Sequence, residues 1–147
     1  MFTYFNAKRT NLFASAFSNQ IIKIENSNQN ELVHGNLDSQ RTVLDIRDAM
    51  EAYYLAAMRG KPGEIYNIGG SKKATVKHIL KKLISLSSKK IITKLDKKLL
   101  RPKDISFQVP DSSKFKKDTK WKEKYKFEDS LKFLLNESRI RYQYLNK

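Results

Sequence analysis

The sequence predicts an α/β protein with a small mixed sheet and flanking helices. Short runs rich in β-branched and aromatic residues alternate along the chain with segments whose apolar residues recur every three to four positions. The 147 residues are 39% hydrophobic, which suffices for the core of one domain, or of one lobe of a larger domain. No segment repeats internally, so a repeat architecture is not expected.

In the first half of the chain, turn-forming residues separate two predicted strands from two predicted helices. The strands are expected at Phe2–Phe5 and Glu31–His34, where Gly35 ends the second. The first helix is expected at Asn11–Glu25, with Phe13, Phe17, Gln20, Ile21 and Ile24 on one side. Asp45 is expected to cap a second helix that runs to Arg59, with a buried stripe of Ile46, Met50, Tyr53, Tyr54 and Ala57.

The second half continues the alternation. Strands are expected at Glu64–Ile68 and Ile91–Thr93, with a partly extended segment at Ile105–Pro110. A helix is expected at Thr75–Leu86 with Val76, Ile79, Leu80, Leu83 and Ile84 inside. A short helix capped by Ser112 or Ser113 should reach Lys117, with Trp121 anchoring the next loop. The last helix is expected from Phe127 to beyond Arg139, with Leu131, Leu134, Leu135 and Ser138 in line. Residues 1–140 form the predicted lobe, and 141–147 a frayed tail.

Composition narrows the function classes. The chain has no cysteine, so disulfides, thiol chemistry and cysteine-based zinc sites are excluded. It shows no signal-peptide pattern and no apolar run of membrane-spanning length, so a cytoplasmic protein without a membrane partner is expected. The net charge of +15 favours polyanionic ligands. Because the lysines are spread between apolar helix positions, a solvated surface is a better explanation than a nucleic-acid interface, which stays the alternative.

Two arginines are candidate phosphate ligands. Arg41 lies just before a helix and Arg101 lies in a Leu-Arg-Pro turn. A planar guanidinium can hold a phosphate through two parallel hydrogen bonds. The alternative is a surface ion pair, for example between Arg101 and Asp104. Asn6 and Asn36 each follow a strand, where an amide can bind a sugar hydroxyl or simply form a turn.

No catalytic, metal-binding or cofactor-binding residue is predicted. His34 and His78 lack metal-ligand spacing, and the sequence contains neither a P-loop nor a glycine-rich dinucleotide loop. No tyrosine and lysine are expected to form an acid–base pair. Tyr53 and Tyr54 are expected in the helix core.

Taken in order, several motifs resemble a known family. They are Gly35-Asn-Leu-Asp-Ser-Gln-Arg41 with Leu44-Asp-Ile-Arg-Asp48, Gly63-Glu-Ile-Tyr-Asn-Ile-Gly-Gly70, Leu100-Arg-Pro-Lys-Asp104, Pro110-Asp-Ser-Ser-Lys-Phe-Lys-Lys117 with Thr119-Lys-Trp121, and Phe5-Asn6 with Arg9-Thr10. The set resembles the GDP-mannose 4,6-dehydratases and GDP-4-keto-6-deoxy-mannose reductases, which are extended short-chain dehydrogenases. The motifs do not separate dehydratase from reductase.

The resemblance implies that this chain is the substrate-binding lobe without its Rossmann domain. In the family, the Rossmann half holds NADP and the catalytic Ser/Thr-Tyr-Lys set. By resemblance, Arg41 and Arg101 contact the GDP phosphates and Asp104 lies near the ribose. Asn6 lies near the sugar or pyrophosphate, and Asn36 shapes the nucleotide pocket.

The sequence also departs from the family pattern. The loop after Asn6 is shortened, Thr42 replaces an aspartate, and Thr119-Lys120 stands where glycine is usual.

The resulting hypothesis is a truncated or split dehydratase-like protein that binds a GDP-sugar but cannot catalyse alone. A Rossmann-domain chain or a full-length homologue is the expected partner. The alternatives are a basic nucleic-acid-binding module and a non-catalytic partner of a full-length homologue. An isolated lobe is expected to be marginally stable or to self-associate through an apolar seam around Phe2, Tyr4, Phe13 and Phe17.

Overall fold

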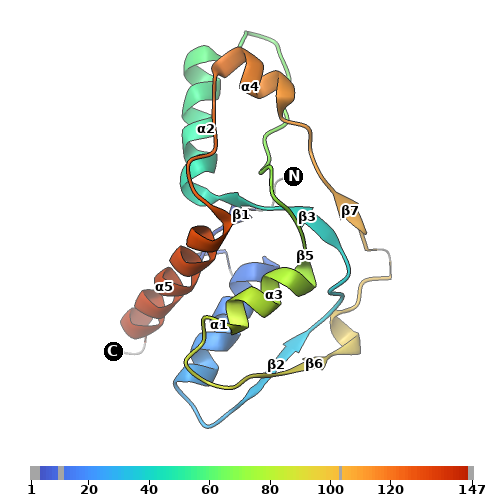
Figure 1. The fold of residues 1–147 in the computed structure, drawn as a ribbon, viewed down its shortest axis with the longest axis vertical. Coiled ribbons are helices and arrows are strands. Elements are labelled where there is room, and N and C mark those ends of the chain that lie inside the picture. The colour runs from blue at the N-terminus through green and yellow to red at the C-terminus, as the bar shows by residue number, and fades with distance from the viewer. Residues whose placement is uncertain (1–3, 10–11, 103, 146–147) are drawn as a thin grey trace.

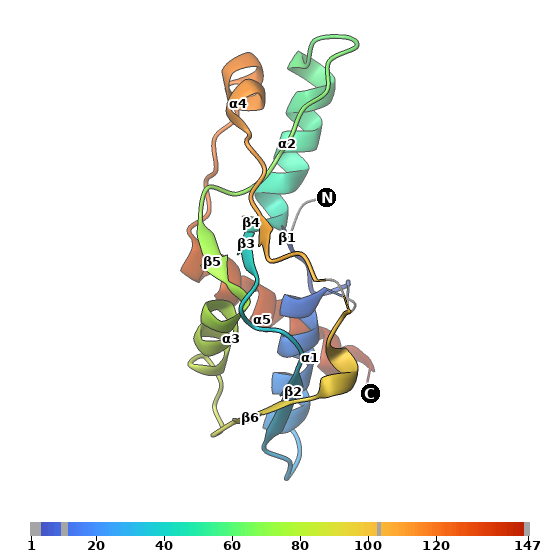
Figure 2. The ribbon, with the colours of Figure 1, turned by 90° about the vertical axis from the view of Figure 1, so that its right-hand side faces the viewer.

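The computed structural model describes residues 4–9, 12–102 and 104–145, and shows an elongated molecule with two tiers. Helices α1 (Phe13–Glu25), α3 (Val76–Ile84) and α5 (Phe127–Leu145) form the lower tier. Helices α2 (Ile46–Arg59) and α4 (Ser113–Thr119) form the upper tier. Short strands lie between the tiers and at the lower end, as the two views in Figures 1 and 2 show.

The strands form three small sheets rather than the single mixed sheet expected from the sequence. Strand β1 (Tyr4–Phe5) pairs in parallel with β4 (Leu44–Asp45). Strand β2 (Glu31–His34) pairs in parallel with β6 (Ile92–Leu95), and a 3₁₀ turn follows at Lys97–Leu99. In the third sheet, β3 (Gln40–Thr42) lies between antiparallel β5 (Lys73–Thr75) and parallel β7 (Phe107–Gln108). The strands at β3 and β5 were not predicted, because each has only three residues.

The lower tier confirms the predicted helix stripes. The main hydrophobic core joins α1, α3 and α5 around fully buried residues such as Ile21, Leu83 and Leu134. On α3, Val76, Ile79, Leu80 and Leu83 are buried, and on α5, Leu131, Leu134, Leu135 and Ser138 are buried. Helix α5 continues to Leu145, so residues 141–145 of the segment expected to fray are helical.

The upper tier corrects the stripe predicted for α2. Asp45 does cap this helix, because its carboxylate accepts a hydrogen bond from the Arg47 N–H. The buried residues are Asp48, Ala49 and Ala52, whereas the predicted stripe is largely exposed, at Met50, Tyr53, Tyr54 and Ala57. Small alanines let α2 approach a second core of Leu44, Ala49, Ala52, Ile68, Phe115 and Trp121. Trp121 is 1% exposed, which confirms its anchoring role.

Two further predictions are wrong in detail. Residues 64–68 are irregular rather than a strand, and Ile65 is 85% exposed. The backbone here bonds side chains instead of a neighbouring strand: Lys114 Nζ donates to the Ile65 carbonyl, and the Gly69 N–H donates to Ser112 Oγ. That second bond occupies the Ser112 hydroxyl, so it does not cap α4.

Two residues of the expected apolar seam, Phe13 and Phe17, are not exposed. Phe17 is 5% exposed and belongs to the main core, and Phe13 packs against that core. Phe2 and the side chain of Tyr4 fall outside the described residues. Large exposed apolar side chains of the upper tier lie instead on α2 and at Ile65.

One edge of β2 is covered by a side chain. The Asn30 carbonyl accepts from the Ile92 N–H in β6 and the His34 carbonyl accepts from the Asp96 N–H just after β6, so the backbone polar groups of Val33 point to the opposite edge. There the Gln20 amide, from α1, donates to the Val33 carbonyl at 3.0 Å and accepts from the Val33 N–H at 2.9 Å. The Gln20 side chain thus takes the place of a neighbouring strand.

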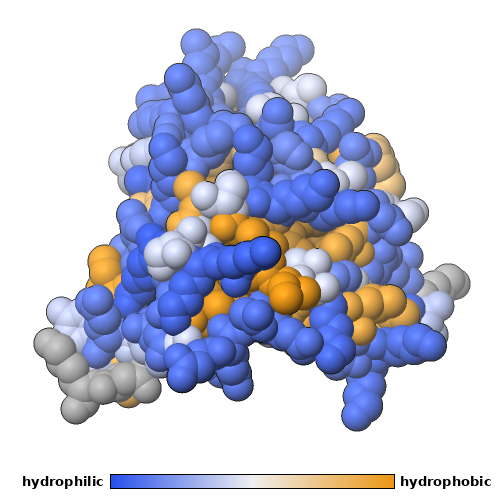
Figure 3. All heavy atoms as spheres, turned by 60° about the horizontal axis from the view of Figure 1, so that its bottom comes forward, coloured by the Kyte–Doolittle hydropathy of each residue, from blue (hydrophilic) through white to orange (hydrophobic). Residues whose placement is uncertain are grey.

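The β2–β6 end is mostly hydrophilic, with hydrophobic residues gathered near the centre of the face in Figure 3. No helix in the described part of the chain is long and apolar enough to cross a membrane.

Candidate nucleotide-sugar site

A cavity of about 420 Å³ opens between α1, the end of β2 and the segment after the 3₁₀ turn. Its volume lies in the range of pockets that hold small molecules. The lining comes from α1 and its start (Leu12, Phe13, Ala16, Phe17, Gln20), from 33–41 (Val33, His34, Gly35, Asn36, Ser39, Arg41), from Val76, and from 99–108 (Leu99, Arg101, Asp104, Ile105, Gln108). Segments more than 60 residues apart in sequence therefore meet around one space.

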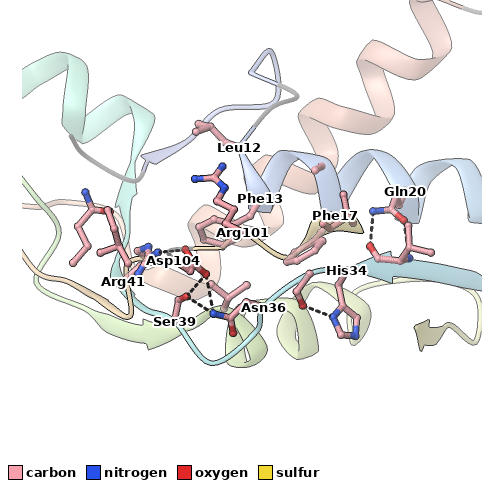
Figure 4. A pocket seen from close by; sticks show the side chains of 17 residues that line it. Leu12, Phe13, Phe17, Gln20, His34, Asn36, Ser39, Arg41, Arg101 and Asp104 are labelled. Carbon is pink, nitrogen blue, oxygen red and sulfur yellow. Dashed lines mark hydrogen bonds and ion pairs between the residues drawn. The ribbon is translucent and has the colours of Figure 1, made fainter. Parts of the chain in front are cut away.

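Asp104 lies at the centre of the polar side of this cavity. Its Oδ2 accepts from Asn36 Nδ2 at 2.8 Å and from Ser39 Oγ at 3.1 Å, and its Oδ1 lies 3.8 Å from Arg41 Nη2. Figure 4 shows the carboxylate between Arg41 on one side and Asn36 and Ser39 on the other. Burial by itself raises the pKa of Asp104, but the hydrogen bonds from Asn36 and Ser39 outweigh it and lower the pKa.

Arg41 is held in place, because its side chain is 12% exposed and also donates through Nη1 to the Gln40 carbonyl at 3.0 Å. Arg101 is exposed, and no residue that the structure describes pairs with its guanidinium. The surface pair between Arg101 and Asp104 that the sequence left open is not formed. The cavity thus has one fixed cation and one cation with unused donors.

An aromatic wall stands opposite the polar side. Phe13 and Phe17, one helical turn apart on α1, meet edge to face with ring centroids 6.0 Å apart. In Figure 4, Phe13 lies beside Arg101. From the sequence, both rings were expected on one side of a helix and in an exposed apolar seam, and their place in the cavity was missed. Ser39, which is 2% exposed, was also missed, because a lone serine in a polar turn gives no signal.

Asn36 does more than form a turn. Its Oδ1 accepts from the Asp38 N–H at 2.9 Å, while its Nδ2 reaches Asp104 and Ser39. Next to it, Gly35 leaves no room for a side chain, because a Cβ there would lie 2.7 Å from the Leu99 carbonyl oxygen. That close approach brings the 3₁₀ turn, and with it Arg101, to the cavity.

Asn6 does not line the cavity. It follows β1, where its Oδ1 accepts from the Lys8 N–H and its carbonyl accepts from Ser15 Oγ. Of the five predicted site residues, the structure therefore brings together Asn36, Arg41, Arg101 and Asp104 and places Asn6 apart.

Tyr4 and Lys8 stand four residues apart, although no tyrosine and lysine were expected to form an acid–base pair. A spacing of four residues brings two side chains next to each other in a helix, whereas in a strand the same two residues lie about 13 Å apart. Here residues 4–8 form a strand end and a turn, and Lys8 is exposed. The four-residue spacing therefore does not make an acid–base pair.

The strand–helix junctions that the structure describes do not fit a dinucleotide cofactor. Such a cofactor places its pyrophosphate on a helix N-terminus behind a glycine-rich turn. At β4–α2 the helix follows the strand without a glycine, and the Asp45 carboxylate already occupies the N-terminus. A carboxylate at that position repels an anionic group.

Comparison with known proteins identifies the family. The sequence profile of the family described as GDP-mannose 4,6 dehydratase matches residues 1–133. The dTDP-D-glucose 4,6-dehydratase of Homo sapiens is 36% identical over 67 residues, which are 46% of this chain and 19% of that protein. The corresponding protein of Mus musculus is 34% identical over the same length.

Solved structures show the same fold. RMD from Pseudomonas aeruginosa, complexed with NADPH, matches 95% of this chain with a TM-score of 0.85 and 19% identity. UDP-glucuronic acid 4-epimerase from Bacillus cereus, in complex with UDP-glucuronic acid and NAD, matches 97% with a TM-score of 0.77 and 19% identity. The chain covers 46% and 45% of those two proteins. The chain therefore has the fold of a part of these proteins, and the profile match over residues 1–133 shows that it belongs to the GDP-mannose 4,6-dehydratase family.

Proposed function

We propose that the cavity between α1 and Asp104 binds a nucleoside-diphosphate sugar, with GDP-mannose or GDP-4-keto-6-deoxy-mannose as the ligand class. The observation that carries this proposal is that Arg41 and Arg101 border one cavity, the first held by Asp104 and the second without a partner among the described residues. Two guanidinium groups suit a diphosphate, because each can form two parallel hydrogen bonds to phosphate oxygens. The net charge of +15 adds long-range attraction for such an anion.

The other walls suit the rest of the ligand. The edge of Phe13 and Phe17 offers an apolar surface to a base or a sugar face. The Asp104 carboxylate can accept from ribose hydroxyls, and the Asn36 amide can donate to or accept from them, provided that the two groups exchange their present bonds. The relatives in this family and fold include proteins named for dTDP-glucose and UDP-glucuronic acid, which supports the nucleotide-sugar class more broadly than the GDP base.

The chain is proposed to bind but not to transform the sugar by itself. Oxidation at the hexose requires a hydride acceptor, and the residues described here do not fit one. A partner half that holds NADP would have to supply that chemistry.

Isothermal titration calorimetry with GDP-mannose, GDP and GMP tests the proposal. GDP-mannose and GDP should bind, and GMP should bind at least about tenfold more weakly, because one of two charge-assisted phosphate contacts is lost. Titrations with dTDP-glucose and UDP-glucuronic acid compare the affinities for nucleotide sugars with different bases, and GDP-mannose is expected to bind most tightly. Equal, weak heats for all five compounds would mean that the cavity is not a nucleotide site.

Arg101→Ala is the decisive variant, since Arg101 is exposed and its removal leaves the fold intact. We expect GDP affinity to fall about tenfold or more. Lys132→Ala removes one positive charge from the exposed surface of α5, away from the cavity, and serves as the control. If both variants lose the same small amount, the effect is general electrostatics and the role given to Arg101 is wrong.

A further inference from the structure

Ser39 is a buried residue whose hydroxyl lies between two polar side chains of the cavity wall. It stands one residue before β3 and is 2% exposed. Its Oγ donates to Asp104 Oδ2 at 3.1 Å and accepts from Asn36 Nδ2 at 3.2 Å, while the same Nδ2 donates to Oδ2 at 2.8 Å (Figure 4). The three groups form a closed ring of hydrogen bonds that uses the single hydroxyl proton and both amide protons.

The backbone around Ser39 is fixed to the start of α3. The Ser39 carbonyl accepts from the Val76 N–H at 3.0 Å, and the Leu37 carbonyl accepts from the Lys77 N–H at 2.9 Å. Helix α3 is held in turn by the main core, to which Val76 belongs. Asp104, in contrast, lies on an exposed segment between the 3₁₀ turn and β7. Ser39 is therefore the fixed end of the hydrogen bond, and Asp104 is the end that it holds in place.

The hydrogen bonds on Oδ2 decide how the Asp104 carboxylate faces Arg41. Because Oδ2 accepts from Asn36 and Ser39, Oδ1 is the oxygen that faces Arg41, at 3.8 Å from Nη2. That distance is too long for a hydrogen bond, so the ion pair attracts the guanidinium but does not orient the carboxylate. Bonds from neutral donors to a charged acceptor are stronger than ordinary hydrogen bonds, so the orientation comes from the two donors on Oδ2.

We propose that Ser39 is a positioning residue of the nucleotide-sugar site: its hydroxyl anchors the Asp104 carboxylate, which keeps Arg41 directed at the phosphates of the ligand. This inference rests on the function proposed above. When the ligand binds, a ribose hydroxyl can replace the bond from the Asn36 amide to Oδ2. The bond from Ser39 then keeps the carboxylate in place, because the hydroxyl is buried and its backbone is fixed by α3.

Calorimetry of serine variants tests the role of Ser39 in binding. Ser39→Ala removes one oxygen atom and leaves the Asn36 bond to Oδ2, so the chain should stay folded, and GDP-mannose affinity should fall about threefold to tenfold. Ser138→Ala is the matched control, because Ser138 is also 2% exposed but its hydroxyl donates to the Leu134 carbonyl within α5. Its affinity should equal that of the wild type. Equal losses in both variants, or no loss in Ser39→Ala, would overturn the proposal.

A double-mutant cycle tests whether Ser39 acts through Asp104. In an Asp104→Ala chain, Ser39→Ala should cost no further GDP-mannose affinity, because the group that the hydroxyl holds is already gone. A loss from Ser39→Ala that is as large without Asp104 as with it would show that the serine acts by another route, and would overturn the proposal.

The carboxyl titration of Asp104 gives a measurement that needs no nucleotide. Burial raises the pKa of Asp104, but the hydrogen bonds from Asn36 and Ser39, the Ile105 N–H and the charge of Arg41 together lower it. Ser39→Ala removes a hydrogen bond to the charged form, so the midpoint measured by carbon-13 NMR should move to higher pH. Ser138→Ala should leave it unchanged, and an unchanged midpoint in Ser39→Ala would overturn the proposal.

The two measurements separate this inference from the function on which it rests. A wild-type chain that binds no GDP-mannose, although Ser39→Ala shifts the Asp104 titration, would refute the proposed function and leave the coupling between the two residues established. Undiminished GDP-mannose binding by Ser39→Ala would refute only the positioning role of Ser39.

Discussion

Lys120 has a left-handed backbone conformation, with φ 60° and ψ 20°, at the end of α4. It is the only non-glycine residue with positive φ among those that the structure describes. Its N–H donates to the Lys116 carbonyl and so closes the helix. Glycine is usual at this position in the family pattern. The positive φ explains this preference, because the conformation strains any residue that has a Cβ.

Lys120→Gly should therefore stabilise the protein by about 1 kcal/mol, since glycine adopts positive φ without the steric cost. Urea unfolding measures the change. Lys122→Gly is the matched control, because Lys122 is exposed and its φ is not positive, so glycine there should lower stability slightly through added chain entropy. A loss of stability in Lys120→Gly would show that the lysine side chain contributes more than its backbone costs.

Asp104 is predicted to act through Arg41 and Asn36 rather than as a catalytic group. Asp104→Asn keeps the shape but removes the negative charge that holds Arg41 and pairs with the Asn36 amide. GDP-mannose affinity should fall about fivefold to tenfold, with little change in stability because the pair is partly exposed. Calorimetry and urea unfolding of the same sample separate the two effects. Asp129→Asn, exposed on α5, is the control. Unchanged GDP-mannose affinity in Asp104→Asn would show that the Asp104 charge is not needed to hold Arg41 in its binding position.

At the scale of elements, sequence periodicity predicted where the long helices lie, but it predicted the buried side correctly for only some of them. The stripes on α3 and α5 were correct because each helix has one apolar face and packs on one core. The stripe on α2 was wrong because both sides of that helix are apolar, and periodicity cannot tell which side faces this chain's core. Residues 64–68 have the composition of a strand, yet strand formation depends on a neighbour that local sequence does not specify.

The sequence predicted which residues line the candidate site better than it predicted the contacts between them. Arg41 and Arg101 were singled out by residue type and by the family pattern, and they do border one cavity. Asp104 forms a hydrogen bond with Asn36, 68 residues away, and not with Arg101. This choice of partner results from packing between segments that are distant in sequence. Local spacing carries no information about such a contact.

The ion pair between α1 and α5 gives a pH dependence. Arg139 donates from Nε and Nη2 to both oxygens of Glu25, at 3.0 and 2.8 Å. These hydrogen bonds, helped by the Ser88 N–H and opposed by burial, lower the pKa of Glu25 below its ordinary value of 4.5. A lowered carboxyl pKa means that the stabilisation is complete above about pH 4.5 and is lost as the pH falls through the folded-state pKa.

Glu25→Gln should accordingly lower the free energy of unfolding by about 1 kcal/mol at pH 7 and by much less at pH 3. Urea titrations at the two pH values measure this difference. Glu31→Gln breaks the exposed pair with Lys94 and should change stability little at either pH. An effect of Glu25→Gln that is as large at pH 3 as at pH 7 would exclude the charge of Glu25 as its origin.

At the scale of the whole molecule, the described residues form two hydrophobic cores of unequal size. The described residues place 18 buried apolar residues in the lower core and six in the upper core. The upper core also carries the exposed face of α2, so it has less buried surface to hold it together. The upper tier should therefore be the first part to unfold.

The single tryptophan reports on this order, because Trp121 lies in the upper core. With increasing urea, its fluorescence should change at a lower midpoint than the far-ultraviolet circular dichroism, which follows mainly α1, α3 and α5. Phe127→Leu, in the lower core, should shift the dichroism transition more than the fluorescence transition. Coincident midpoints by both probes in every variant would mean that the two cores unfold as one unit.

The amide of Gln20 has a consequence for how the chain avoids aggregation. The β2–β6 ribbon exposes Val33, Ile92 and Leu95, and a free strand edge with apolar side chains is a template for pairing with another chain. Proteins often block such an edge with a charge or a proline. Here a neutral glutamine, fixed by α1, occupies the hydrogen-bonding positions of Val33. The block lasts only while α1 is folded, so partial unfolding of that one helix would uncover a strand edge ready to recruit other chains.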